Sequence, residues 1–283
     1  MTARAAILGA TGVLGRHVLP RLVERGHEVR AIVRRDGEVD VMRRIGIDAA
    51  IGDILDPVAL PSAIKGCTVA LHLATTVPRP GQSVDWSAND RIRREGTANL
   101  IAACKQAGIR RYVQQSLAFL VGGTDGLVDE TAPLLPPNEV TASAIDMEHH
   151  VIESGLDWTI LRDGALYGPR TGRDEHWREL ARAGQLRMPG SGSDYISLIH
   201  VADLAEAFAL AAEHAPPHTI LSIVDDKPVT YRELLTYLAH QENGLDPTPG
   251  ELSHLPSFRI DNSRAKRTLR WHPYYRSYRS GFA

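Results

Sequence analysis

A glycine-rich turn near the start of the chain has the spacing of a phosphate-binding loop. Residues 9–15 read Gly-Ala-Thr-Gly-Val-Leu-Gly, between a short apolar stretch, 4–8, and an amphipathic stretch, 13–24. Glycines allow a tight turn and a close approach of the backbone to a ligand, and the first amides of a following helix attract an anion. We therefore predict a site for the pyrophosphate of a dinucleotide. Its contacts would come from Gly9, Thr11, Gly12, Val13, Leu14 and Gly15.

Two arginines follow the second expected strand, about 20 residues beyond the glycines. An acidic residue at this place binds a ribose diol and selects NAD, whereas an arginine accommodates the phosphate of NADP. Arg34 and Arg35 therefore favour NADP. NAD stays open as the alternative because Asp36 follows directly.

The elements that position this loop are expected to alternate between strand and helix. Such alternation is typical of parallel crossover units and predicts an α/β fold, a Rossmann-like doubly wound parallel sheet with a smaller C-terminal substrate-binding lobe. The expected strands are 29–33, 49–51, 69–73, 112–115 and 158–161, and the expected helices are 57–65, 90–106, 201–213 and 230–240.

The two regions are predicted to divide after residue 162. Residues 1–162 would form the dinucleotide-binding Rossmann core, and residues 163–283 a mixed region that completes the core and forms the substrate lobe. No linker-like stretch or internal repeat separates them, so the lobe is not expected to be an independent domain.

Composition excludes several classes of function. The chain has 283 residues, 43% of them hydrophobic, and a formal net charge of −2, so no nucleic-acid partner is expected. Cys67 and Cys104 are isolated, and the adjacent His149 and His150 do not share a helical face, so no metal site is expected. No apolar run is long enough to span a bilayer, and we expect a cytoplasmic protein with no membrane partner.

Several ordered segments resemble the extended short-chain dehydrogenase/reductases, the NAD-dependent epimerase/dehydratase family. They run nearly from end to end of the chain: GATGVLG at 9–15, VRR at 33–35, GDILD at 52–56, LHLA at 71–74, EGTANL at 95–100, LRDGALYGP at 161–169, IHVAD at 199–203 and LRWHP at 269–273. The resemblance implies that Asp53 and Ile54 lie near the adenine, and that Leu73, Ala74 and Thr75 lie near the ribose and nicotinamide. A turn role for Asp53 is an equal alternative.

The catalytic residues that the resemblance implies are missing from the sequence. The family uses a serine or threonine after the fifth strand and then a Tyr-x-x-x-Lys pair on the next helix. Aligned on Glu148, the tyrosine position falls on Val140, the lysine position on Ala144 and the serine position on Leu117. No tyrosine occurs between Tyr112 and Tyr167, and no lysine between Lys105 and Lys227. An atypical member with an apolar pocket is therefore predicted, with loss of selection on the pair as the alternative.

Another group would then have to move protons. Asp163 follows Leu-Arg where the family usually has proline, and a desolvated carboxylate there could act as a general base. Tyr167 could donate to a substrate oxygen, and His176 is a third candidate because histidine is a common general acid or base. Each also has a structural reading: a loop-capping aspartate, a packing tyrosine and a surface histidine.

Three further groups of residues have mainly structural interpretations. Arg91, Arg93 and Arg94 are predicted to form a solvated helix face that could border a homodimer interface. The motif that contains His200 and Asp203 is expected to join the lobes. Trp177 and Tyr195 lie in the segment that covers the substrate in relatives.

We predict an NAD(P)-binding enzyme that acts on a small, apolar or aromatic organic molecule, with secondary metabolism as a candidate context, without the usual Ser, Tyr and Lys relay. An oxidoreductase or epimerase-like activity is expected. Two alternatives stay open at this point: a non-redox isomerase, lyase or cyclase on the same fold, and a dinucleotide-sensing regulatory protein.

Overall fold

The computed structural model describes residues 3–77, 85–253 and 255–282. Its centre is a seven-stranded parallel sheet in the order β11-β6-β5-β4-β1-β2-β3. The strands are β1 (Arg4–Leu8), β2 (Glu28–Val33), β3 (Asp48–Ile51), β4 (Val69–His72), β5 (Arg111–Leu117), β6 (Asp157–Asp163) and β11 (Thr219–Ile223). The prediction of a Rossmann-like parallel sheet is confirmed.

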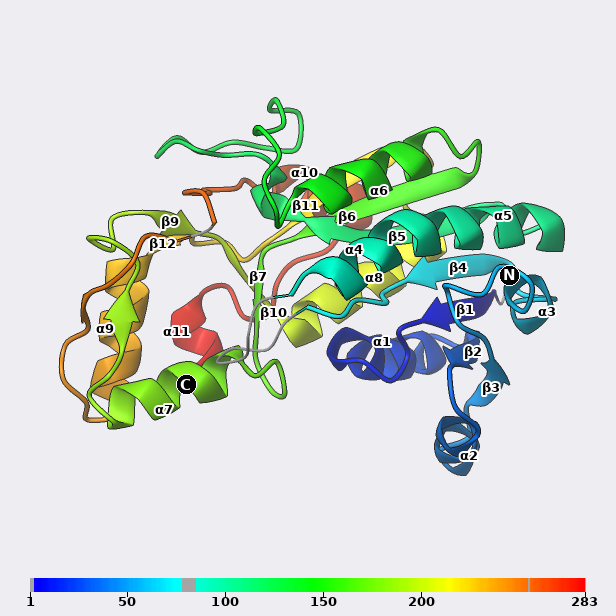
Figure 1. The fold of residues 1–283 in the computed structure, drawn as a ribbon, viewed down its shortest axis with the longest axis horizontal. Helices are drawn as coiled ribbons and strands as arrows, with labels where there is room; N and C mark the ends of the chain where they lie inside the picture. Colours follow the sequence, from blue (N-terminus) through cyan, green and yellow to red (C-terminus); the bar gives the residue numbers. More distant parts are fainter. Residues whose placement is uncertain (1–2, 78–84, 254, 283) are drawn as a thin grey trace.

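Alternating small and branched apolar residues explain why the sheet is covered on both faces. In β1, Ala5 and Ile7 pack against α1 (Val13–Glu24) and α8 (Val201–His214), whereas Ala6 and Leu8 face the other layer. That layer contains α3 (Leu60–Ala63), α5 (Thr97–Ala107) and α6 (Ala142–Ile152), and Figure 1 shows α5 and α6 side by side over the sheet.

Two further helices contribute to the apolar core that α1 and α8 form with the sheet. Helix α2 (Asp36–Arg44) follows β2 and packs next to β3, and α10 (Ser263–Leu269) packs against β11 and α8. The expected helix at 57–65 is shorter than predicted, because the structure has only α3 there.

The expected helix at 90–106 is continuous in space but not regular. It begins as α4 (Ser87–Arg91), widens into a π-helical turn (Ile92–Gly96), and continues as α5. A π-turn inserts one residue into the helical repeat and therefore rotates the side chains that follow it.

Short strand pairs and two helices form a second part of the molecule, which we call the C-terminal lobe. It contains α7 (Arg173–Arg182), α9 (Tyr231–Gln241), and the pairs β9–β12 (Tyr195–Ile196, Val229–Thr230) and β8–β13 (Arg187–Met188, Thr248–Pro249). Figure 1 shows this lobe at the left, beyond the carboxyl ends of the sheet strands. Its apolar core is separate from the two cores that cover the sheet.

The chain crosses between sheet and lobe more than once. Strands β7 (Ala165–Tyr167) and β10 (Leu198–His200) pair in parallel between the two parts, and β11 returns to the edge of the sheet. The tail ends in α11 (Tyr278–Gly281), which packs near β10. Within the described residues, no helix has the length and apolar character needed to cross a membrane.

Candidate nucleotide site and reaction site

The glycine turn lies where the strand order of the sheet reverses, between β1 and β4. Ligands of doubly wound sheets bind at this switch point. Gly9 has a φ of +87°, and the amide of Gly12 donates to the Gly9 carbonyl oxygen at 2.9 Å. A Cβ atom on Gly9 would lie 2.6 Å from the carbonyl carbon of Leu73, and one on Gly15 would overlap the Gly9 carbonyl. Both glycines are therefore required by the fold itself.

Gly12 differs from the other two glycines. It is exposed, and a Cβ atom there would meet only the Gly9 carbonyl oxygen, at 3.1 Å, among the described atoms within 4 Å. No side chain caps the start of α1, so its first amides are available to an anion. Thr11 is half-buried in the turn, and Val13 and Leu14 begin the helix. This arrangement fits a pyrophosphate that approaches the backbone at Gly12.

The residues predicted for the adenosine end lie at the ends of β2 and β3. Arg34 and Arg35 are exposed, and the Glu38 carboxylate accepts hydrogen bonds from both of their backbone amides, at 3.1 and 3.2 Å. The backbone that carries their guanidinium groups is thus fixed by Glu38. Asp53 accepts from the amide of Leu55 at 2.9 Å, which is the turn role considered for it.

The other predicted cofactor residues line the same edge of the sheet. Ile54 is buried against Gly96, and its carbonyl accepts from the side chain of Asn99 at 3.1 Å. Leu73, Ala74 and Thr75 follow β4, with Leu73 buried beside Gly9 and Thr75 exposed. All three segments therefore meet at the carboxyl edge of β1 to β4.

A second group of residues gathers where β5 and β6 end, and we call it the β6 site: Gln115, Asp163, Arg93, Val140 and Ala144. Leu117, half-buried at the end of β5, is in register with Asp163 at the end of β6. Val140 and Ala144, at the predicted tyrosine and lysine positions, are both buried. Both aligned positions, one just before α6 and one in its first turn, are thus apolar.

A buried ion pair holds α6 against the sheet. Glu148 of α6 and Arg162 of β6 are 2% and 4% exposed, and their closest nitrogen and oxygen atoms lie 2.7 Å apart. The hydroxyl of Ser116 also donates to Glu148, at 2.6 Å. Because the bidentate pair and the hydroxyl satisfy the carboxylate, the charges are tolerated in the core.

Asp163 is buried at the carboxyl end of β6. Its Oδ2 atom accepts a hydrogen bond from Gln115 Nε2 at 3.2 Å, and its Oδ1 atom has no partner in the described part of the chain. Burial raises the pKa of Asp163 to about 7, against the opposing effects of Gln115 and the nearby Arg93. A carboxyl group with this pKa exchanges its proton near neutral pH, as general acid–base chemistry requires.

The prediction of a solvated helix face is wrong for Arg93. Arg91 and Arg94 are largely exposed and pair with Glu95 and Asp146. Arg93 is instead 4% exposed, and its Nη1 atom donates to the Val140 carbonyl at 2.9 Å and to Ser143 Oγ at 3.2 Å. Arg93 shares a helix face with the buried Thr97 and Leu100, whereas Arg91, two residues away, points in another direction. Burial lowers the pKa of Arg93 to about 10.

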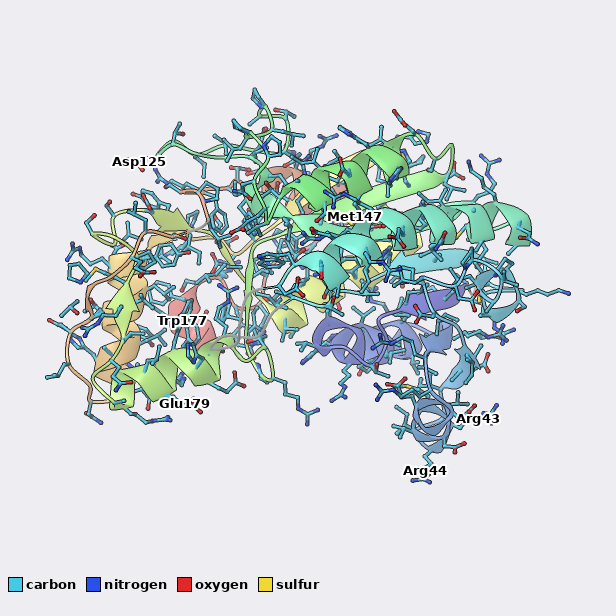
Figure 2. The ribbon with its side chains drawn as sticks, in the orientation of Figure 1. Arg43, Arg44, Asp125, Met147, Trp177 and Glu179 are labelled. Carbon is cyan, nitrogen blue, oxygen red and sulfur yellow. The ribbon has the colours of Figure 1, made fainter. Side chains whose placement is uncertain are left out.

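Tyr167 and His176 do not lie with Asp163 in one hydrogen-bonded group in the described structure. The Tyr167 side chain is fully buried, its ring centroid lies 4.7 Å from that of Phe282, and its hydroxyl donates to the Ser277 carbonyl at 3.4 Å. His176 is half-buried on α7. Figure 2 shows Trp177 extending from α7 toward the interior beside α11, whereas Glu179 lies on the outer side.

The structure has a mostly apolar cavity of about 340 Å³. Its walls come from the residues after β5, from Asn138 and Thr141, and from Ser253, Leu255 and Pro256. Val140 lies between these two polar residues in the sequence, so one short segment lines the cavity and also accepts the hydrogen bond of Arg93. Sequence reasoning missed this cavity because its walls are far apart along the chain.

His200 and Asp203, which were expected to join the two parts of the molecule, both contact the tail. The carboxylate of Asp203 accepts from the amides of Tyr274 and Tyr275, both at 2.9 Å. The His200 ring lies against that of Tyr275, with centroids 3.8 Å apart. These contacts fix the tail on α8.

Residues 9–211 match the model of a protein family described as NAD(P)H-binding. The chain belongs to this family. The match covers the glycine turn, both ends of the nucleotide site and the β6 site.

Curated relatives of this NAD(P)H-binding chain are named as reductases and dehydrogenases. A 3-diazoavenalumate denitrifying reductase from Streptomyces sp is 32% identical over 304 residues and covers 98% of each chain. A 4-hydroxy-2-methyl-3-oxo-4-farnesyl-3,4-dihydroquinoline-1-oxide ketoreductase from Stigmatella aurantiaca is 29% identical, over 83% of this chain and 72% of the relative. The prediction of an oxidoreductase or epimerase-like enzyme agrees with these names.

Solved structures support the fold of the family member. The UDP-glucose 4-epimerase of Thermotoga maritima is 20% identical, with a TM-score of 0.83 over 98% of this chain and 96% of the epimerase. The NAD complex of the Thermus thermophilus UDP-glucose 4-epimerase is 23% identical, with a TM-score of 0.81 over 98% and 96% of the two chains. At this level of identity the likeness concerns the fold alone.

Proposed function

We propose that the chain is an NADPH-dependent reductase of a small aromatic or apolar molecule, and that it works without a Ser, Tyr and Lys relay. The observation that carries this proposal is the burial of the apolar Val140 and Ala144 at the positions aligned with the family tyrosine and lysine. A phenol has a pKa of about 10 and needs a nearby cation to act as a base at neutral pH. At the β6 site the sequence has no lysine and no tyrosine to fill this role.

The nucleotide would be held by the glycine turn and by the edge of the sheet. Gly12 leaves room for the pyrophosphate, Arg34 would meet the phosphate of NADP, and Leu73 to Thr75 would lie beside the nicotinamide end. A reduced nicotinamide supplies a hydride when it is bound. The protein then has to position an acceptor and, for some acceptors, to donate a proton.

Our first candidate acceptor is a diazo group on an aromatic or apolar body, the class named by the Streptomyces relative. In such a reduction a C–H bond forms, the C–N bond breaks, and dinitrogen leaves with the electron pair of that bond. Dinitrogen takes no proton from the protein. An apolar β6 site without a tyrosine and lysine suits this chemistry.

The second candidate acceptor is a carbonyl group, and Asp163 favours it. Reduction of a carbonyl leaves an alkoxide that must be protonated. With a pKa raised to about 7, Asp163 carries a proton in a large fraction of molecules at neutral pH and could donate it. The named ketoreductase from Stigmatella aurantiaca supports testing this route as well.

The test is anaerobic turnover with deuterated NADPH and two probes: the quinone diazide made from 4-aminophenol, and an aryl alkyl ketone. For the diazide we expect release of dinitrogen and deuterium at the carbon that carried it, with a rate that Asp163→Asn leaves nearly unchanged. For the ketone we expect dependence on Asp163. Tight NADPH binding without oxidation of NADPH by either probe would contradict the reductase and favour a regulatory or non-redox protein.

A further inference from the structure

Arg93 is a buried cation without a carboxylate partner. Its side chain is 4% exposed, and within the described part of the chain no carboxylate oxygen lies within 4 Å of it. Its helical neighbours differ, because Arg91 pairs with Glu95, and Arg94 pairs with Asp90 and Asp146. A buried charge is costly unless it is paired and hydrogen-bonded, so an unpaired one calls for an explanation.

The hydrogen bonds of Arg93 use only part of its guanidinium group. Both of these bonds come from Nη1, to the Val140 carbonyl and to Ser143. A guanidinium has five N–H donors in a fixed fork, so those on Nε and Nη2 are without a partner among the described residues. Asp90 and Asp163 are near enough to affect its charge but do not neutralise it by direct contact.

The surroundings define what a partner would look like. The segment that accepts the Arg93 bond at Val140 also lines the apolar cavity through Asn138 and Thr141, with Phe119 on another wall. Asp163, whose Oδ1 atom is buried and unpartnered among the described residues, lies close enough to affect the charge of Arg93. A ligand that fits this arrangement has an apolar or aromatic body and one negatively charged oxygen group at the end nearest Arg93.

We infer that Arg93 binds an oxyanion of the substrate, a carboxylate or a phenolate carried on an aromatic body that occupies the cavity. This inference rests on the proposed function for the reaction that follows binding, and it adds the charge and the orientation of the substrate. The planar fork suits an oxygen anion because it can donate two parallel hydrogen bonds. Binding would also neutralise the buried cation, so the site would favour anions over neutral analogues of the same shape.

The test measures binding and needs no turnover. Isothermal titration calorimetry is done on the protein saturated with NADP⁺, using cinnamate against cinnamamide for the carboxylate arm and 4-nitrophenolate against 4-nitroanisole for the phenolate arm. In at least one arm we expect the anion to bind about tenfold or more tightly than its neutral analogue. Arg93→Met should remove this preference, and Arg93→Lys should restore part of it.

Arg91→Met is the matched control, because Arg91 lies close by on the same helix and is exposed. It should keep the preference of the unchanged protein. Circular dichroism checks the fold of each variant. If Arg93→Met does not fold, the inference is decided by the unchanged protein and by Arg93→Lys.

Equal binding of anion and neutral analogue in both arms would overturn the inference, as would a preference that survives in folded Arg93→Met. Failure of the proposed function looks different. An anion preference that depends on Arg93, in a protein that never oxidises NADPH, would support the binding site and refute the reductase.

Discussion

The nucleotide turn and the β6 site lie at the same edge of one sheet but differ in the groups that they present to a ligand. The turn uses backbone atoms and glycines, with an open position at Gly12. The β6 site and the core beside it use buried side chains with charge. Arg162 and Glu148 of that core are paired, whereas Arg93 and Asp163 are not in direct contact with an opposite charge among the described residues. A backbone turn binds a pyrophosphate, which all dinucleotide cofactors share. Unpaired buried charges can instead select one substrate.

This difference suggests how each region responds to mutation. A substitution in the turn should affect ligand approach or the fold according to which glycine is changed. A substitution in the β6 site should change electrostatic free energy, because a charge in the core has few water molecules to replace a lost partner.

The largest effect is expected where the buried ion pair is broken. Glu148→Gln leaves Arg162 charged and without its carboxylate, and should lower the free energy of unfolding by about 3 kcal/mol. Chemical denaturation measures this change. Asp157→Asn, which affects the exposed pair with Arg110, is the control and should cost less than about 1 kcal/mol. Similar small costs for both would mean that the β6 site is not held by buried charge.

The next largest effect is a loss of NADPH binding, and it should distinguish Gly12 from Gly15. Gly12→Val should weaken NADPH binding roughly 100-fold, because the side chain would occupy the approach of the pyrophosphate while the fold stays intact. Calorimetric titration and a thermal melt together measure both quantities. Gly15→Ala should destabilise the fold as well, since its Cβ atom has no room. Unchanged NADPH affinity in Gly12→Val would place the pyrophosphate elsewhere.

Asp163→Asn should separate the two candidate reactions. For a carbonyl substrate we expect a roughly 10- to 100-fold fall in kcat. In the unchanged protein this activity should decline as pH rises through about 7, because the acid form is lost. The variant should lack that decline. A full carbonyl activity in Asp163→Asn, measured across pH, would remove this residue from proton transfer.

Stability gives an independent check on the same carboxyl group. Because the folded pKa is raised above the unfolded value, the contribution of Asp163 to stability is complete below the unfolded pKa of 3.8 and is lost as pH rises toward 7. The free energy of unfolding should fall by up to about 1.4 kcal/mol per pH unit within this window. Denaturation of Asp163→Asn should not show this fall.

The smallest effect is expected at the adenosine end. Arg34→Ala should weaken NADPH binding about tenfold and leave NADH binding nearly unchanged, because an exposed arginine contributes through one phosphate. Arg44→Ala, on the exposed side of α2 (Figure 2), is the control. An equal loss for both cofactors would remove Arg34 from the choice between them.

Much of the nucleotide end could be predicted because its signals are local. The turn at Gly9 to Gly15 needs backbone conformations that favour glycine, so the spacing of the glycines in the sequence indicates the turn. The strands were also predictable, since residues that alternate between two buried faces must be apolar on both. The resemblance to a known family identified the same region.

The β6 site was less predictable. Asp163 was singled out by its place after Leu-Arg, but its burial and its bond with Gln115 depend on the pairing of β5 and β6. Arg93 was grouped with the surface residues Arg91 and Arg94, but its burial depends on the segment with Val140 and Ser143 that covers it. The cavity has walls from residue 119 to residue 256, which no local pattern connects.

By itself, the sequence determined the positions of strands β1 to β6, the dinucleotide turn and the absence of a tyrosine and lysine pair between residues 112 and 167. Only the tertiary structure decided that Arg93 is buried against Val140 and Ser143, that Asp163 is desolvated and that distant segments form the walls of one cavity. The physical reason is that backbone conformation follows from neighbouring residues, whereas desolvation depends on which distant segments cover a side chain.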